Sequence, residues 1–312
     1  MTVATDDLAE MAPDRPAPVL NRTRPYYWSV RRELWENRSL HIAPLAVAAV
    51  ALLGFMISTI GMPERRRGVL ALDPVRQVID VSQPYDFVAV AIIFTMGIVA
   101  VTYCLGALHG ERRDRSVLFW KSLPISDLTT VLAKATVPFV VLPVIAIGVI
   151  LAMQLLMLVW SFFVLLLSGV NPFTPLPLAQ MAVVLVYGLV TQILWQAPVY
   201  GWLLLVSAWA RRAPFLWAVL PPLALCMLEK VAFNTHYLAT VLGHRLGGGH
   251  SEAFVTSTHL AVHKGTPHFP VLGVADLDPA KFLSSPALWV GLVICAACLA
   301  GCVWFRRRRE PI

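Results

Sequence analysis

The chain has 312 residues and a formal net charge of +7, with 58% hydrophobic and only 14% charged residues. Soluble domains carry about 25% charged residues, so this composition excludes an ordinary soluble domain. Several apolar runs reach the roughly 20 residues that a helix needs to cross a bilayer. Because backbone groups in lipid must bond within their own segment, we expect these runs to be helices. The sequence predicts an all-α, polytopic membrane protein.

The basic residues lie mostly at the ends of the apolar runs. There they orient helices and contact anionic headgroups, so membrane lipids are the expected partners of the positive charge. We expect no nucleic-acid binding, because no basic surface is interleaved with exposed aromatic side chains on which bases would stack. All five cysteines fall within apolar runs, so the sequence predicts no disulfide framework.

Two segments precede the first apolar run. Residues 1–25 are polar, acidic and rich in proline, which predicts a disordered tail. In residues 26–40, apolar and aromatic side chains such as Leu34 and Trp35 alternate with charged ones such as Arg31. This pattern predicts an amphipathic helix that lies in the membrane interface.

Six apolar runs are long enough to span a membrane, and they define a transmembrane domain over residues 41–305. The third and fourth runs exceed one bilayer thickness, so they are expected to tilt or to extend beyond it. Prolines within the runs predict local kinks. The predicted spans are 41–62, 87–109, 137–167, 179–209, 213–233 and 286–305.

The distribution of basic residues predicts the orientation. With both termini inside, 17 of the 25 Lys and Arg residues lie on inside segments, among them the basic tail 306–312. Arg65 to Arg67 fall in an outside loop and argue the other way, but Asp73, Asp80 and Asp86, assigned to the same loop, offset them. We therefore expect a multi-pass protein of a bacterial inner (cytoplasmic) membrane with N-in/C-in topology.

The longest outside segment, residues 234–285, precedes the last span and holds six of the eight histidines. Parts of it are hydrophobic, so short interfacial or re-entrant helices are expected there. His259 and His263 are four residues apart and on a helix would present two imidazoles to one metal ion. Few carboxylates and no cysteine accompany them, so we expect surface histidines, with these two as the alternative metal ligands.

A short charged insert, residues 109–126, separates the second and third runs. Its apolar part, Val117 to Trp120, is too short to cross a membrane. Pro124 ends that helix, and Ser126 can cap the next one. The pattern predicts a short helix held across the membrane face as a docking surface for a soluble partner. The alternative is an ordinary interfacial loop with its aromatic side chains in the headgroups.

These features occur in a recognisable order. An interfacial helix, six spans, Glu-Arg-Arg after the second span, Leu123-Pro124-Ile125-Ser126, Lys134 at the third span and a large outer loop follow one another. In this order, residues 26–305 resemble the permease subunits of type-2 ABC transporters. The outer loop before the last span is longer than a minimal permease needs.

The resemblance implies that residues 26–40 are a connecting helix and that residues 112–122 are a coupling helix seated in a groove of an ATPase. It also implies two ATPase subunits and a second permease copy as partners. The chain has no phosphate-binding loop, so ATP and Mg would belong to the ATPase, and the chain would be neither an enzyme nor a holder of its own cofactor. The residues implied in docking are Glu111, Arg112, Arg113, Asp114, Phe119, Trp120, Lys121 and Pro124.

Polar side chains within the spans are the substrate-pathway candidates, because in lipid they either bond between helices or line a pathway. Gln192, Gln196 and Tyr200 recur every four residues, which puts them on one helical face. Glu229 and Lys230, at the outer end of the fifth span, are either an outer gate or a snorkelling boundary pair. The pathway candidates are Gln154, Tyr187, Thr191, Gln192, Gln196 and Tyr200.

From the resemblance we expect the transmembrane subunit of an ABC exporter that moves a hydrophobic or amphipathic substrate. Two alternatives remain. One is a membrane-embedded, metal-dependent enzyme that uses the outer histidines, and the other is a mechanical subunit that transmits ATPase strokes without transporting anything.

Overall fold

The computed structural model describes residues 23–69, 74–114, 125–171, 176–255 and 273–308. In these residues the regular structure is helical, apart from one isolated bridge between Phe254 and Leu277. Six helical segments are long and apolar enough to span a membrane, which confirms the predicted all-α, polytopic membrane fold. These segments are Ser39–Arg65, Asp80–Arg113, Asp127–Leu167, Leu178–Trp209, Pro214–Phe233 and Pro286–Arg308.

The helices follow one another along the described part of the chain. They are α1 (Thr23–Glu36), α2 (Ser39–Ser58), the 3-10 turn η1 (Thr59–Gly61), α3 (Met62–Val69), α4 (Pro74–Ala107), α5 (His109–Arg113), α7 (Asp127–Thr136), the π-helical turn η2 (Val137–Val141), α8 (Leu142–Leu167), α9 (Leu178–Trp209), α10 (Pro214–Phe233), α11 (Tyr237–Gly247), α12 (Gly249–Ala253), the 3-10 turn η3 (Val274–Asp276), α13 (Pro279–Ser284) and α14 (Pro286–Arg308).

Local sequence explains where the third spanning segment begins. The Ser126 hydroxyl accepts a hydrogen bond of 3.1 Å from the Thr129 backbone N–H, as the predicted N-cap requires. The helix begins ten residues earlier than the predicted span because α7 buries one apolar face and continues through η2 into α8. Pro138 lies in the π-helical turn, where the regular α-helical hydrogen bonding is interrupted.

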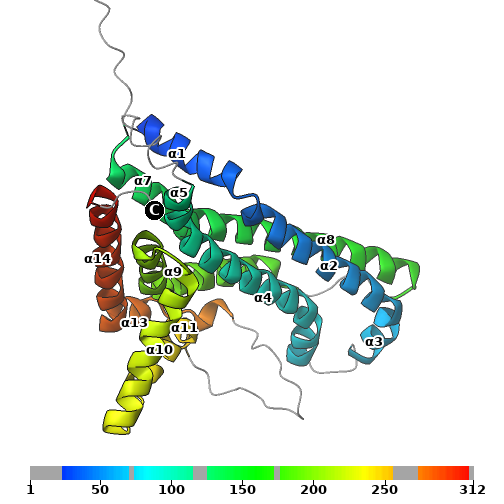
Figure 1. The fold of residues 1–312 in the computed structure, drawn as a ribbon. Helices are drawn as coiled ribbons and strands as arrows, with labels where there is room; N and C mark the ends of the chain where they lie inside the picture. The colour runs from blue at the N-terminus through cyan, green and yellow to red at the C-terminus, as the bar shows by residue number, and fades with distance from the viewer. Residues whose placement is uncertain (1–22, 70–73, 115–124, 172–175, 256–272, 309–312) are drawn as a thin grey trace, which may run out of the picture.

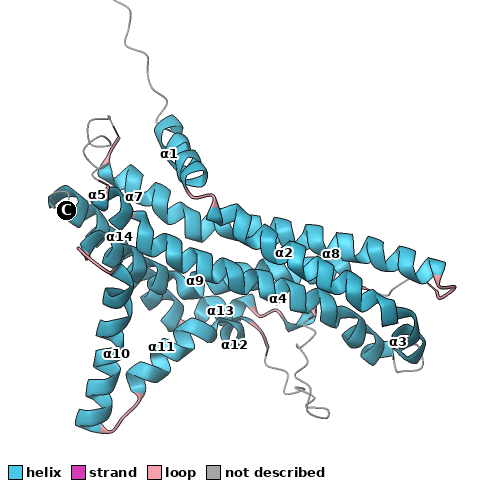
Figure 2. Cartoon of the chain, turned by 45° about the vertical axis from the view of Figure 1, so that its right-hand side comes forward, coloured by secondary structure: helices cyan, strands magenta, loops and turns pink. Residues whose placement is uncertain are grey.

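Four elements gather at one end of the molecule. Figure 1 shows α1, α5, α7 and the C-terminal end of α14 there. From this end α2, α4 and α8 run away side by side, while α9 packs along α14. Figure 2 shows α10 leaving the bundle, with α11 returning from its far end toward α9.

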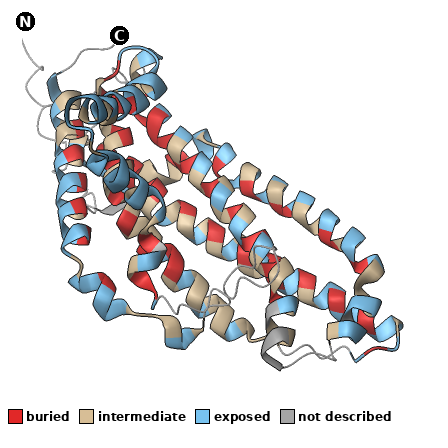
Figure 3. Cartoon of the chain, turned by 90° about the horizontal axis from the view of Figure 1, so that it is seen from below, coloured by how far each residue is buried: buried red, intermediate tan, exposed pale blue. Residues whose placement is uncertain are grey.

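Buried side chains follow inward-facing stripes, and the outward faces are largely exposed and apolar (Figure 3). Ile92, Ile150 and Leu204 come from α4, α8 and α9 and are almost fully buried in one core. In α10 the buried side chain is Ala218, while residues such as Leu223 and Leu228 are exposed. Outward apolar side chains are the expected lining of a surface that contacts lipid.

The spanning helices α9 and α14 approach each other closely at Gly201. A Cβ atom added at Gly201 would lie 3.1 Å from the Cα atom of Cys295, so a side chain there would force the two backbones apart by a few tenths of an ångström. Small residues at helix contacts are the usual way for helices to pack tightly in lipid. Cys295 is buried as a free thiol, which fits the reading of this cysteine as a small packing residue.

We predict that Gly201→Leu lowers the free energy of unfolding by about 1–3 kcal/mol, because the added side chain forces α14 away from α9. The measurement is thermal unfolding of the purified chain in detergent, followed by tryptophan fluorescence. The control is Gly54→Leu in α2, where an added Cβ meets nothing within 4 Å. Equal melting temperatures for the two variants would show that the α9–α14 contact is not tight.

Candidate functional site

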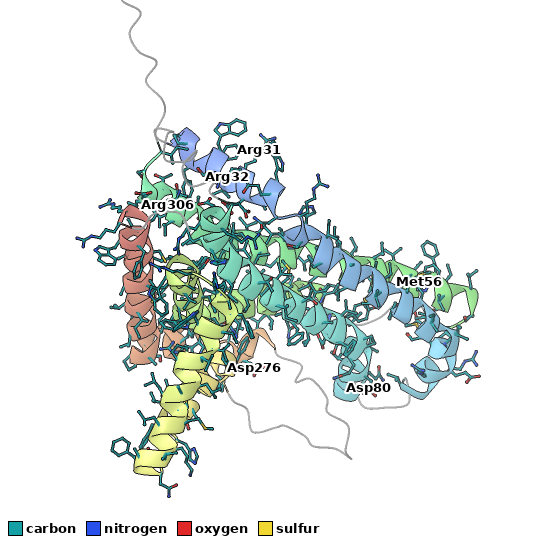
Figure 4. The ribbon with its side chains drawn as sticks, in the orientation of Figure 1. Arg31, Arg32, Met56, Asp80, Asp276 and Arg306 are labelled. Atoms are coloured by element: carbon teal, nitrogen blue, oxygen red, sulfur yellow. The ribbon has the colours of Figure 1, made fainter. Side chains whose placement is uncertain are left out.

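A group of charged side chains lies at the end where α1, α5, α7 and α14 meet, and we call it the ionic cluster. Figure 4 labels two of its members, Arg32 and Arg306, which lie at this end on α1 and α14. Three of its side chains are cationic and three are anionic, so the cluster is neutral as a whole. Its members are Arg32, Glu33, Glu111, Asp127, Lys134 and Arg306.

Glu111 is the centre of the cluster. Its Oε1 atom lies 2.9 Å from Arg32 Nη2 and 3.1 Å from Lys134 Nζ. Its Oε2 atom accepts a hydrogen bond of 2.7 Å from Arg306 Nη1. One carboxylate of α5 thus contacts cations from three other helices.

Glu33 and Asp127 complete the charge balance. Lys134 Nζ donates to Glu33 Oε1 at 2.8 Å, and the Tyr103 hydroxyl of α4 donates to Glu33 Oε2 at 2.9 Å. Arg306 Nε donates to Asp127 Oδ1 at 2.9 Å. Glu33 and Lys134 each expose only 3% of their side chains, so these charges are tolerable only because they are paired.

The amphipathic character of α1 explains how Glu33 reaches the interior. Trp28 and Trp35 are exposed, and the Arg31 guanidinium lies 5.1 Å and 4.5 Å from their ring centroids. Glu33 lies on the buried side of the helix, which packs against α7. The charged and aromatic faces are therefore arranged so that one binds the protein and the other is left for the surroundings.

The neighbouring carboxylates stabilise the charged form of Arg32. Burial lowers the pKa of the guanidinium, but the carboxylates of Glu33, Glu36 and Glu111 more than offset this and raise the pKa above its ordinary value. Arg32 is therefore a permanent cation at this junction. Burial also raises the pKa of Glu36, which pairs with Arg32 Nε at 3.4 Å one helical turn along α1.

The two ends of the insert between the second and third spans are both anchored here. At its start, Arg112 Nη1 donates to the Ala208 carbonyl of α9 at 2.7 Å, and the Ser207 hydroxyl accepts from the backbone N–H groups of Leu108 and His109 at 3.0 Å and 2.9 Å. At its far end, Asp127 is held by Arg306 of α14. The insert therefore leaves and re-enters the body at fixed points.

The predicted docking residues divide into three groups. Glu111 is buried in the ionic cluster, and Arg112 is half-buried against α9. Arg113 and Asp114 form an exposed pair at 3.1 Å, with 71% and 63% of their side chains accessible. Docking itself stays a prediction, because the remaining members, Phe119, Trp120, Lys121 and Pro124, lie outside the described residues.

A cavity of about 960 Å³ lies among α4, α8 and α9, with α10, α11 and Phe254 contributing to its wall. It is lined by four of the six pathway candidates, Gln154, Gln192, Gln196 and Tyr200. The Tyr200 hydroxyl donates to Gln196 Oε1 at 2.9 Å, and Gln196 Nε2 donates to the Leu246 carbonyl of α11 at 3.0 Å. Gln196 therefore bonds between α9 and α11, Tyr200 bonds within α9, and both side chains also line the cavity.

The other two pathway candidates make local contacts outside the cavity lining. The Tyr187 hydroxyl donates to the Ala253 carbonyl at 2.9 Å. The Thr191 hydroxyl donates to backbone carbonyls of the preceding turn of its own helix, at 3.0 Å. Their positions support the reading of these two residues as structural.

Glu229 and Lys230 lie at the turn from α10 into α11. The Glu229 carboxylate accepts hydrogen bonds from the backbone N–H groups of Tyr237 and Leu238 at 2.7 Å and 2.8 Å, where the α11 helix dipole favours a negative charge. Lys230 Nζ lies 2.9 Å from His236 Nε2. Both side chains therefore order this turn, and their role as an outer gate stays a prediction.

The described part of the segment before the last span folds onto α9 and α14 as short helices. Trp195 is buried there with Phe254 and Phe282, and the Arg245 guanidinium lies 4.4 Å from its ring centroid. Burial lowers the pKa of Arg245 below its ordinary value. A Cβ at Gly291 would lie 2.8 Å from Arg245 Nη1, so the absence of a side chain on α14 makes room for this arginine.

The histidine-based metal site is not tested by the structure. His259 and His263 lie outside the described residues. In the parts of the chain that the structure does describe, no group of three or more His, Cys, Asp or Glu side chains is placed to hold a metal ion.

Sequence reasoning missed the ionic cluster. Glu33 was read as part of a polar helix face, Lys134 as the start of a span, and Arg306 as part of a basic tail. The available signal was that each lies within or beside a segment with an apolar face, where a lone charge is costly. Opposite charges at the ends of different spans are candidates for one another's partners.

Comparison with family models, with curated proteins and with solved structures gave no match to this chain. The fold and the site define it as a polytopic α-helical membrane protein with a buried ionic cluster at one end.

We predict that Glu111→Gln lowers the free energy of unfolding by about 3–5 kcal/mol, because it leaves two buried cations, Lys134 and Arg306, and the partly buried Arg32 with too few anions. Thermal unfolding of the purified chain measures this. The control is Asp114→Asn, which breaks only the exposed pair with Arg113 and should change stability by less than about 0.5 kcal/mol.

A second variant separates charge from shape. The double variant Glu111→Gln/Lys134→Met removes one charge of each sign, so it should recover part of the stability that either single variant loses. Strictly additive losses would show that the residues are not coupled through charge.

Proposed function

We propose that this chain is the transmembrane permease subunit of an ABC exporter, which couples ATP hydrolysis in a separate subunit to movement of a hydrophobic or amphipathic substrate. The observation that carries the proposal is the anchoring of both ends of the insert to the ionic cluster. Glu111 holds one end in the cluster, beside the hydrogen bond from Arg112 to α9, and Asp127 holds the other end.

An insert that is anchored at both ends can transmit a movement of a bound partner to the spanning helices. A soluble partner that moves residues 112–122 pulls on Glu111 and Asp127, which are paired with α14 through Arg306. The Glu111 carboxylate is also paired with Arg32 of α1 and with Lys134 of α7. A displacement at the insert therefore reaches the second, third and sixth spans together, since buried ion pairs resist separation.

The chain itself carries no phosphate-binding loop, so in this proposal ATP and Mg are bound by the partner. By the resemblance, two ATPase subunits and a second permease copy complete the transporter, and the chain is not an enzyme. Residues 112–122 would act as the coupling helix and α1 as the connecting helix. The apolar cavity among α4, α8 and α9 is the candidate substrate site.

The same proposal places the chain in a bacterial cytoplasmic membrane with both termini inside. The ionic cluster, α1 and the C-terminal end of α14 share one end, which would then face the cytosol. That arrangement would put most basic residues on the cytosolic side.

We predict that the tagged chain, purified from native membranes in mild detergent, carries a nucleotide-hydrolysing polypeptide. Arg113→Glu should lower the yield of that complex by about tenfold or more, because charge reversal in a docked surface opposes binding. Arg113 is exposed, so its replacement leaves the ionic cluster intact.

The control for this experiment is Arg211→Glu, since Arg211 is exposed beyond the same end of α9 that Arg112 contacts. Its complex yield should match that of the parent chain. A parent complex without ATPase activity would contradict the proposed function, and equal losses in the two variants would contradict docking at the insert.

The orientation predicts a labelling pattern. In Ser251→Cys, the new thiol should react with a membrane-impermeant maleimide in intact cells, whereas in Ser126→Cys it should react only after permeabilisation. Both serines are exposed, and the parent cysteines, which all lie in spanning segments, supply the background. The reverse pattern would contradict the N-in/C-in orientation.

A further inference from the structure

The cavity among α4, α8 and α9 has the size and wall of a ligand site. Its volume of about 960 Å³ lies at the upper end of the range of about 300–1,000 Å³ that is typical of small-molecule sites. Most of the wall is apolar, with residues such as Ile93, Leu142 and Leu185 from the three helices. An occupant must therefore present a sizeable apolar surface.

Asp86 of α4 sets the charge of this cavity. Among the described residues that line it, Asp86 is the only acidic or basic side chain. Ser82, one turn earlier on α4, makes a side-chain hydrogen bond to its carboxylate. None of the ion pairs that the described residues make with one another includes Asp86.

The position of Asp86 favours a strong interaction between its carboxylate and a cationic ligand. It lies within the second spanning segment, 21 residues before Ala107, which is about 30 Å along the helix axis from the ionic cluster end. A carboxylate that faces an apolar cavity interacts strongly with an opposite charge, because little water screens the pair. Ionisable groups at such positions in spanning helices commonly mark a ligand pathway.

The remaining polar groups of the wall are uncharged. Gln154 and Gln192 provide amides that can orient a ligand without adding charge. A divalent metal ion would need about six oxygen ligands, whereas the described wall brings one carboxylate. An anion would meet the like charge of Asp86, which disfavours it.

We propose that this cavity binds amphipathic monocations, with the cationic group at Asp86 and the apolar body against α8 and α9. In the proposed exporter, such monocations would be the transported substrates, and this part of the inference rests on the proposed function. Binding itself needs no ATPase, so it can be tested on the chain alone.

The experiment compares two ions of nearly the same size and shape and of opposite charge. Radiolabelled tetraphenylphosphonium should bind saturably to the purified full chain in detergent, in a scintillation proximity assay, whereas radiolabelled tetraphenylborate, assayed separately because the two ions precipitate each other, should not. Asp86→Asn should raise the Kd for tetraphenylphosphonium by about tenfold or more, because it removes the charge and keeps the shape. Asp86→Glu keeps the charge and should stay within about threefold of the parent chain.

The matched control is Asp80→Asn. Asp80 lies six residues earlier on α4, is exposed and does not belong to the described lining, and Figure 4 shows it at the end of α4 far from Arg306. Size-exclusion elution and melting temperature confirm that each variant is folded. An unchanged Kd in Asp86→Asn, saturable binding of tetraphenylborate in its own assay, or an equal loss in Asp80→Asn overturns the proposal. Any of these results leaves the ATPase experiment unaffected.

Discussion

The arrangement of this protein depends on one buried carboxylate, Glu111, which is shared by cations from three other helices. A charge removed from water without partners costs several kcal/mol, so none of these helix ends can be buried alone. Arg32, Lys134 and Arg306 come from segments that are more than 100 residues apart in some pairs, yet all three contact the one carboxylate of Glu111 when the four helix ends meet. The cluster thereby fixes which helices are neighbours at this end.

Such a constraint matters more in lipid than in water. Spanning helices gain little from burying apolar surface against one another, because lipid tails are equally apolar. Polar contacts and close packing at small residues must then select the arrangement. The ionic cluster provides the polar contacts. The approach of Gly201 to Cys295 provides close packing between α9 and α14. Elsewhere the outward faces remain apolar, and they specify no partner by themselves.

Sequence patterns predicted the features that depend on neighbours along the chain. The six spans follow from the length of apolar runs, and the Ser126 cap follows from a residue type and its spacing. The shared face of Gln192, Gln196 and Tyr200 follows from helical periodicity, and all three line the cavity. Ion pairs between helix ends that are distant in the chain produce no local sequence pattern from which they could be predicted. Asp86 was assigned to a loop because the apolar run was placed from residue 87, whereas α4 begins earlier and carries Asp86 within the span.

The ionic cluster and the cavity are joined by two different kinds of connection. On α4, the Tyr103 hydroxyl donates a hydrogen bond to Glu33, and Asp86 of the same helix lines the cavity. One continuous helix therefore links the two sites. On the next span, the π-helical turn follows Lys134 by three residues and contributes Pro138 to the cavity wall, and such turns occur frequently at functional sites. Under the proposed function, a displacement of the ionic cluster by the ATPase would move α4 as a rigid body. The same displacement would bend the α7–α8 segment at the π-helical turn. The two walls of the cavity would then move unequally, so the shape of the cavity would change.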